Sequence, residues 1–163
     1  MNSKRKISIE VFEDHDKVTF YSIRIDSNKD LETDSFFDKT FNYKKFEEDI
    51  GIISKMIDKI GENGAKTRNF RNAGTRSDGV GSLPEYLYSS KLRLYAIHLN
   101  SKIVILGNGG LKSTKAYNDD PYLNDCVEVL RELDRHLKSR IKKGTVVVYE
   151  NQLMGNLNFT LLQ

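Results

Sequence analysis

The chain has 163 residues, of which 38% are hydrophobic and 30% charged, a balance that suits one folded domain with a core of useful size. No apolar run is long enough to cross a bilayer, and the N-terminal sequence MNSKRKISIE lacks the apolar segment of a secretory signal. A single cysteine, Cys126, excludes an internal disulfide framework and suits a reducing compartment. We therefore expect a single cytoplasmic domain over residues 1–163, with no part in the membrane.

Positive charge is concentrated in the middle third of the chain. The net charge is only +3, yet residues 61–117 hold nine Lys and Arg against three Asp and Glu. The segments before and after, 1–60 and 118–163, are each slightly negative. A local positive field of this kind is typical of a protein that binds a polyanion. The alternative is a solvated loop in which Lys and Arg are enriched by chance.

The first predicted elements are two strands that form a hairpin within residues 1–26. Apolar residues alternate over Ile7–Val11, and Val18–Ile25 is rich in β-branched and aromatic residues. His15 lies between them, and we interpret it as an exposed turn residue because no second His or Cys is near it in the sequence. Residues 27–42 form a polar connector, with or without a short helix, whose phenylalanines dock onto the sheet.

A helix is predicted over Tyr43–Ile60. Its apolar residues recur at steps of three and four, with charged residues between them. Asn42 is the candidate N-cap and Gly61 the candidate C′ residue. Gly51 disfavours the helix locally, although a glycine there allows close packing on a sheet.

Residues 61–84 show no sustained period and are predicted to form a basic loop. Arg68, Phe70 and Arg71 interleave cations with an aromatic residue, as single-stranded nucleic-acid binders do. A loop of this length is unusual unless it is functional or disordered, and the alternative is a plain surface loop after a helix. On the first interpretation, RNA is bound by the four cations of the segment: Lys66, Arg68, Arg71 and Arg76.

The segment 92–117 is predicted to be the centre of the site. A strand begins at Leu92, Asn100-Ser101 forms a hairpin turn, and the apolar run Ile103–Leu106 reads as a strand covered on both faces. A glycine-rich loop, 107–110, then leads to Lys112, Lys115 and Tyr117. Flexible backbone followed by cations at a sheet edge suits an anion, which we interpret as RNA phosphate.

No cofactor is predicted for this segment. The glycines have neither the GK[ST] spacing of a Walker A motif nor the GxGxxG spacing of a dinucleotide fingerprint. His98, late in the first strand, is interpreted as a histidine at the edge of the core rather than a catalytic base.

A second helix is predicted from Asp120-Pro121 to Gly144, with an apolar stripe on one face and charges on the other. Cys126 and His136 are ten residues apart, which is not a metal-ligand spacing, so we interpret both as structural. A strand over 145–149 follows. The run 156–162 pairs with it as a hairpin, or is a tail ordered by a partner.

The chain holds no Ser/His/Asp set, no facing pair of carboxylates and no metal cluster that its sequence reveals. Basic and aromatic residues are what converge in sequence. Such groups hold phosphates and stabilise the charge of a phosphorane during attack by a 2′-OH, or bind RNA without chemistry.

The segment KLRLYAIHLNSKIVILGNGGLKSTKAY resembles the RelE/ParE-type toxins of bacterial type II toxin–antitoxin pairs. In that family a YRLVY-like motif, a short turn, a hydrophobic strand and a basic stretch ending in Tyr recur at similar spacing. The resemblance covers residues 43–117. It implies an α+β fold with helices packed on a twisted antiparallel sheet, to which residues 1–26 add an N-terminal hairpin and residues 118–163 a helix and C-terminal strands.

The resemblance also implies a function: a toxin that inhibits translation as a metal-independent endoribonuclease on mRNA at the ribosome, held inactive by a cognate antitoxin. It implies a catalytic set in which Arg93 stabilises phosphate charge, Lys112 or Lys115 contacts the scissile region and Tyr117 orients or stacks. The chain departs from the family in its length and in the GNGG insertion before Lys112. The alternatives are a non-catalytic toxin or binding module that acts on DNA gyrase or another protein, and an α+β domain whose basic loop is only solvated.

Overall fold

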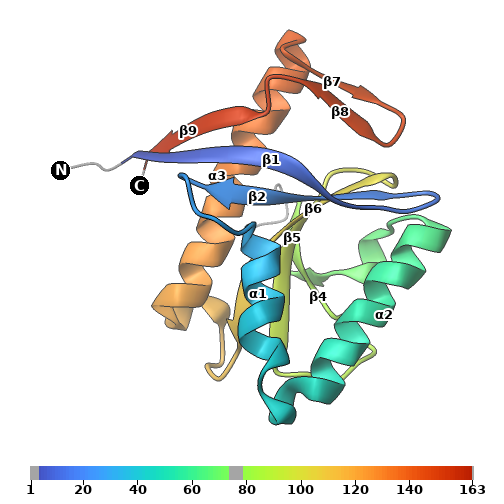
Figure 1. Cartoon of the computed structure of the whole chain (residues 1–163), viewed down its shortest axis with the longest axis vertical. Helices are drawn as coiled ribbons and strands as arrows, with labels where there is room; N and C mark the ends of the chain where they lie inside the picture. The colour runs from blue at the N-terminus through green and yellow to red at the C-terminus, as the bar shows by residue number, and fades with distance from the viewer. Residues whose placement is uncertain (1–3, 74–78, 163) are drawn as a thin grey trace.

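The protein, described here from a computed structural model over residues 4–73 and 79–162, is an α+β structure built on a seven-stranded mixed sheet. Figure 1 shows the sheet with helices packed against it and the N- and C-terminal strands side by side. The strand order across the sheet is β3 (Arg71–Asn72), β4 (Val80–Leu83), β5 (Leu92–His98), β6 (Ile103–Leu111), β2 (Thr19–Ile25), β1 (Lys4–Asp14) and β9 (Asn158–Leu162).

The central hairpin β5–β6 confirms the prediction made from its apolar pattern. The two strands are antiparallel, and the run Ile103–Leu106 is fully buried between both faces of the sheet. β2 pairs with β6 in the parallel sense, so the expectation of a wholly antiparallel sheet is wrong at this pair. The long connection through two helices and three strands gives the chain the crossover that a parallel pair needs.

Helices cover both faces of the sheet. α1 (Glu32–Phe41) and α2 (Glu47–Asn63) pack on one face, and the 23-residue α3 (Pro121–Lys143) packs on the other (Figure 1). β5 shows the division, since Leu94 joins the core beneath α2 and Tyr95 joins the core beneath α3. No helix within the described ranges has the length and apolar character needed to cross a membrane.

The bounds of α2 differ from the predicted helix. A 3₁₀ turn over Lys44–Phe46 precedes it, so Asn42 is not its N-cap. The helix continues past Gly61 to Asn63, and Gly64, with φ of 96°, is the residue that ends it. Gly61 is instead buried in the last turn, where its lack of a side chain serves packing rather than termination.

The predicted start and end of α3 are confirmed. The Asp120 side chain accepts hydrogen bonds from the backbone N–H groups of Tyr122 at 2.9 Å and Leu123 at 3.2 Å, and Pro121 opens the helix. Gly144 ends it in the left-handed region, with φ of 82°.

Three predicted loops and pairings are corrected. Residues 107–110 are not a loop: β6 continues through them to Leu111, because the glycines let neighbouring groups approach the strand closely. The segment 61–84 is not all loop, since it contains β3 and the buried strand β4. At the C-terminus β7 (Val146–Tyr149) pairs with β8 (Gln152–Gly155), whereas β9 pairs with β1, so the predicted hairpin between 145–149 and 156–162 is wrong. Burial of Phe159 and Leu161 against the core is what places β9 there.

Candidate nucleic-acid interface

Arg93 lies at the start of β5, opposite Gly110 of β6. Its half-buried guanidinium donates through Nη1 to the carbonyl oxygens of Ser90 at 2.5 Å and Leu92 at 2.9 Å. Among the described residues no acceptor is bonded to its Nε or Nη2. The backbone therefore orients the guanidinium, and one edge of it stays available for an anion.

Arg71 is a second guanidinium in the same neighbourhood. It donates from Nε to the Pro84 carbonyl at 2.8 Å and from Nη2 to the Tyr88 carbonyl at 2.5 Å. Burial, and then the like charge of Arg71, lowers the pKa of Arg93. Within the described ranges, neither arginine forms an ion pair with a carboxylate. Two cations that repel each other and form no ion pair in this part of the structure favour the binding of an anion.

Tyr95, which the sequence analysis did not select, lies on β5 near Arg93 and contacts Tyr117. The rings of Tyr117 and Tyr95 are 6.3 Å apart at 61°, and Tyr95 is two residues from Arg93 on β5. Tyr95 is only 2% exposed, and burial raises the pKa of its hydroxyl, which therefore stays protonated. The spacing of two along a strand, which places Arg93 and Tyr95 on one face, is the signal that could have found it.

Lys112 and Lys115 follow β6 at the same end of the sheet. The Lys112 backbone N–H donates to the Lys91 carbonyl at 2.6 Å, which extends the pairing beyond Arg93 and Gly110. The Lys112 Nζ donates to the Lys115 carbonyl at 3.0 Å, and Lys115 is exposed. No hydrogen bond or ring contact between described residues joins either lysine to Arg93 or Tyr117. The four predicted catalytic residues thus share one end of the hairpin, but only Arg93 and Tyr117 are linked, through Tyr95.

The predicted RNA-binding residues divide into two groups. Lys66 and Arg68 are exposed and line a cavity of about 810 Å³ beside α2, whereas Arg71 reaches the loop after β4. Arg76 lies outside the described residues. Phe70 is not available for stacking on a base, because it is buried with its ring 5.0 Å from that of His98, which corrects the interleaved pattern.

Tyr86 connects the two groups and was missed by the sequence analysis. Its ring lies 5.2 Å from the Arg71 guanidinium, and its hydroxyl accepts a hydrogen bond from the Asn72 backbone N–H at 2.9 Å. Tyr86 also lines the cavity that holds Lys66 and Arg68, and it is 63% exposed. An exposed aromatic ring between cations is the arrangement on which single-stranded bases stack. Its position in the connection between β4 and β5 gave no periodic signal.

α1 adds one more cation near the end of β6. The Lys39 Nζ lies 4.4 Å from the centre of the Tyr122 ring and donates to the Tyr122 hydroxyl, which in turn donates to the Gly109 carbonyl at 3.1 Å. Burial lowers the pKa of Lys39. Burial also raises the pKa of the neighbouring Cys126 thiol to about 11, which leaves it protonated and unreactive.

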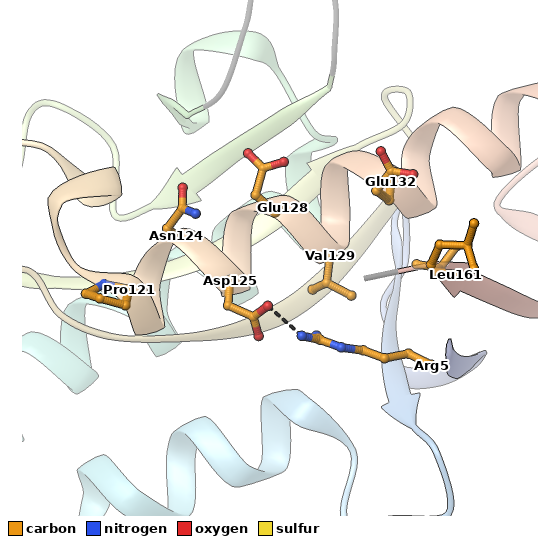
Figure 2. Close-up of a pocket in the computed structure, with 9 residues that line it drawn as sticks. Arg5, Pro121, Asn124, Asp125, Glu128, Val129, Glu132 and Leu161 are labelled. Atoms are coloured by element: carbon orange, nitrogen blue, oxygen red, sulfur yellow. Dashed lines mark hydrogen bonds and ion pairs between the residues drawn. The ribbon is translucent and has the colours of Figure 1, made fainter. Parts of the chain in front are cut away.

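A separate hollow between α3 and β9 is lined by carboxylates that pair with arginines. Its volume is about 500 Å³, and Figure 2 shows three carboxylates along it, those of Asp125, Glu128 and Glu132. Asp125 points toward Arg5 and pairs with it at 2.6 Å (Figure 2). The other two carboxylates pair with Arg131 and Arg135 on α3, so the described residues of the hollow include no unpaired cation of the kind that the candidate interface offers to phosphate.

These observations define an α+β protein with a mixed sheet and with cationic and aromatic side chains along its central hairpin. Arg93 lies at the open end of the hairpin, whereas Lys66 follows Ala65, whose N–H donates to the Ser101 carbonyl in the turn. No protein-family model, no curated protein and no solved structure matches the chain. The interpretation of the surface therefore depends on its own geometry and chemistry.

Proposed function

We propose that the chain is a RelE/ParE-type toxin of a type II toxin–antitoxin pair and that it cleaves mRNA without a metal ion. The observation that supports this proposal is the pair of guanidinium groups, Arg71 and Arg93, which lie together without an ion-pair partner among the described residues. The Tyr117 ring contacts that of Tyr95, two residues from Arg93, so a phenol lies beside the strand that carries this cation.

In the proposed reaction the 2′-OH of one nucleotide attacks the adjacent phosphorus and gives its proton to water. The 5′-oxygen of the next nucleotide leaves and takes a proton from water, which gives a 2′,3′-cyclic phosphate and a 5′-hydroxyl. Negative charge develops on the non-bridging oxygens, and Arg93 stabilises it through its unbonded Nε and Nη2 donors. Lys112 or Lys115 contacts the scissile region, and Tyr117 orients or stacks on the substrate. Lys66 and Arg68 hold phosphates further along the strand, and Tyr86 stacks on a base between them.

The partners in this proposal are mRNA in the ribosome and a cognate antitoxin that keeps the toxin inactive. Expression of the chain from an inducible promoter is expected to arrest growth, and primer extension is expected to find new 5′ ends in translated mRNA. Arg93→Ala with Lys112→Ala should abolish both effects. Lys142→Ala, which removes an exposed cation at the far end of α3, is the matched control and should keep both. Growth arrest that survives the double substitution contradicts the proposed site.

A second candidate, a non-catalytic toxin that binds DNA gyrase or another protein, is favoured by the exposed apolar loop after β4. Leu87 is 87% exposed between Tyr86 and Tyr88, and Arg71 holds this loop in place. Exposed neighbouring apolar groups are typical of protein contacts. On this alternative the native chain inhibits DNA supercoiling by gyrase and produces no new mRNA ends. The Leu87→Ser variant no longer arrests growth.

A further inference from the structure

His15 packs against α2. The sequence analysis had predicted an exposed turn residue at this position, and that prediction is wrong. A Cβ atom at Gly61 would lie 2.3 Å from the His15 Cγ, so the imidazole fills the space that this glycine leaves. The ring also meets Phe20 edge-on at 5.3 Å, and the side chain is only 19% exposed. Packing against Gly61 and Phe20 therefore fixes the position of the imidazole, and its Nε2 faces Glu13.

Two carboxylates lie beside this imidazole. The Glu13 Oε1 is 3.3 Å from the His15 Nε2, and Asp58 is on α2 one turn before Gly61. One ligand atom from each of Glu13, His15 and Asp58 lies within 4.8 Å of the other two. In the part of the chain that the structure describes, no Lys or Arg forms an ion pair with Glu13 or Asp58. Two close carboxylates without a cation repel each other, and a divalent ion would remove that repulsion.

We propose that Glu13, His15 and Asp58 bind one divalent transition-metal ion, for which Zn²⁺ is the probe. One imidazole nitrogen and two carboxylate oxygens are a donor set that Zn²⁺ accepts, with water in the fourth position. Tetrahedral ligands with bonds of about 2.1 Å are about 3.4 Å apart, so the exposed Asp58 side chain and the half-buried Glu13 side chain close the site by rotation. The imidazole, which is the ligand hardest to position, is already in place.

The proposed ion joins the turn after β1 to α2 and is remote from the arginines. Register places Thr19, just after this turn, opposite Ile103 at the start of β6, whereas Arg93 is opposite Gly110 near its end. The metal site therefore does not depend on the proposed function. The sequence analysis predicted no metal site because Asp58 is far from His15 along the chain and only the packing of α2 brings them together.

Titration calorimetry of the tag-free full chain with ZnCl₂ tests the proposal. One Zn²⁺ per chain is expected, and the melting temperature should rise with Zn²⁺ concentration. Glu13→Gln, His15→Gln and Asp58→Asn should each weaken binding by more than the roughly ten- to hundredfold that follows loss of an outer-shell group. Asp16→Asn, in the same turn, and His136→Gln, on α3, are the matched controls and should bind as the native chain does.

Paramagnetic broadening by Mn²⁺ in two-dimensional NMR then locates the ion. Amide signals of residues 13–17 and 58–61 should broaden first, and Glu13→Gln should suppress the effect. His15→Gln removes a packed ring, so the two carboxylate variants decide the matter if that variant does not fold. Absence of Zn²⁺ binding, binding that survives both Glu13→Gln and Asp58→Asn, or broadening centred elsewhere overturns the proposal.

Discussion

The imidazole ring of His15 occupies the space beside Gly61 in which any other residue would place its side chain. The separation between a built Cβ at Gly61 and the His15 Cγ is 2.3 Å, well inside contact distance. Glycine inside a helix costs about 1 kcal/mol relative to alanine, so the position would favour alanine on helix propensity alone. Gly61 thus places the first hairpin against α2.

Gly61→Ala is therefore expected to destabilise the protein. Overpacking against a ring that is itself confined costs at the upper end of about 1–3 kcal/mol, which exceeds the gain of about 1 kcal/mol in helix propensity. Gly51→Ala in the same helix meets no atom within 4 Å and should instead stabilise the protein. Urea unfolding of the two variants measures the difference. Equal stability for both variants would show that His15 moves aside freely.

Substitution of Gly109 by alanine is expected to destabilise the protein more than the same substitution of Gly61 does. A Cβ atom there would lie 1.8 Å from the Arg93 carbonyl oxygen, a backbone atom that cannot rotate away. Gly109→Ala should lose about 3 kcal/mol of stability and displace Arg93, so that growth arrest is also reduced. Gly110→Ala places its Cβ at an ordinary 3.4 Å from Tyr122 and should keep native stability. Circular dichroism melts and growth curves of both variants test the contrast.

The sequence predicted correctly those elements that are determined by neighbouring residues along the chain. The hairpin β5–β6 follows from alternation and a turn, and α3 follows from its stripe, Asp120 and Gly144. The glycines of 107–110 misled because, in isolation, they are typical of a loop. They form strand because α3 lies close to Gly107 and β5 lies close to Gly109, so that a side chain does not fit at either position, and no local pattern contains this.

The residues of the candidate site were likewise predictable only where a local pattern in the sequence marked them. Arg93 and Tyr117 could be chosen because they flank a recognisable hairpin. Tyr86 and Lys39 could not, because their contacts with Arg71 and Tyr122 arise only through the tertiary fold. The same reason hid the relation between His15 and Asp58.

Tyr95→Phe is expected to raise stability. Among the described residues the buried Tyr95 hydroxyl has no hydrogen-bond partner, and a buried group left without one costs about 1–3 kcal/mol. Phenylalanine keeps the ring contact with Tyr117 and removes that cost, so the urea midpoint should increase. Tyr117→Phe, at a half-buried position, is the control and should change stability little. A loss of more than about 1 kcal/mol in Tyr95→Phe would mean that the hydroxyl is bonded after all.

His98 makes stability depend on pH just below neutrality. Its ring is stacked on Phe70, and burial lowers its pKa from 6.5, an effect that hydrogen bonds with the backbone of Ala65 and Asn100 oppose only in part. As pH falls, the unfolded chain takes up the proton first, at its ordinary pKa. The contribution of His98 to stability is therefore full above about pH 6.5 and decreases below it, by at most about 1.4 kcal/mol per pH unit.

His98→Gln should remove this dependence, which urea midpoints measured between about pH 7.5 and about pH 5 will show. The quantity to compare between the native chain and the variant is the change of the urea midpoint with pH. The midpoints themselves are not comparable, because the substitution alters packing and shifts all of them together. Glu10 does not interfere: hydrogen bonds from Arg24 lower its pKa below 4.5, so its contribution is present above that pH and is lost only at lower pH. His136→Gln, on the surface of α3, should keep the native slope. An unchanged slope in His98→Gln would assign the pH dependence to another group.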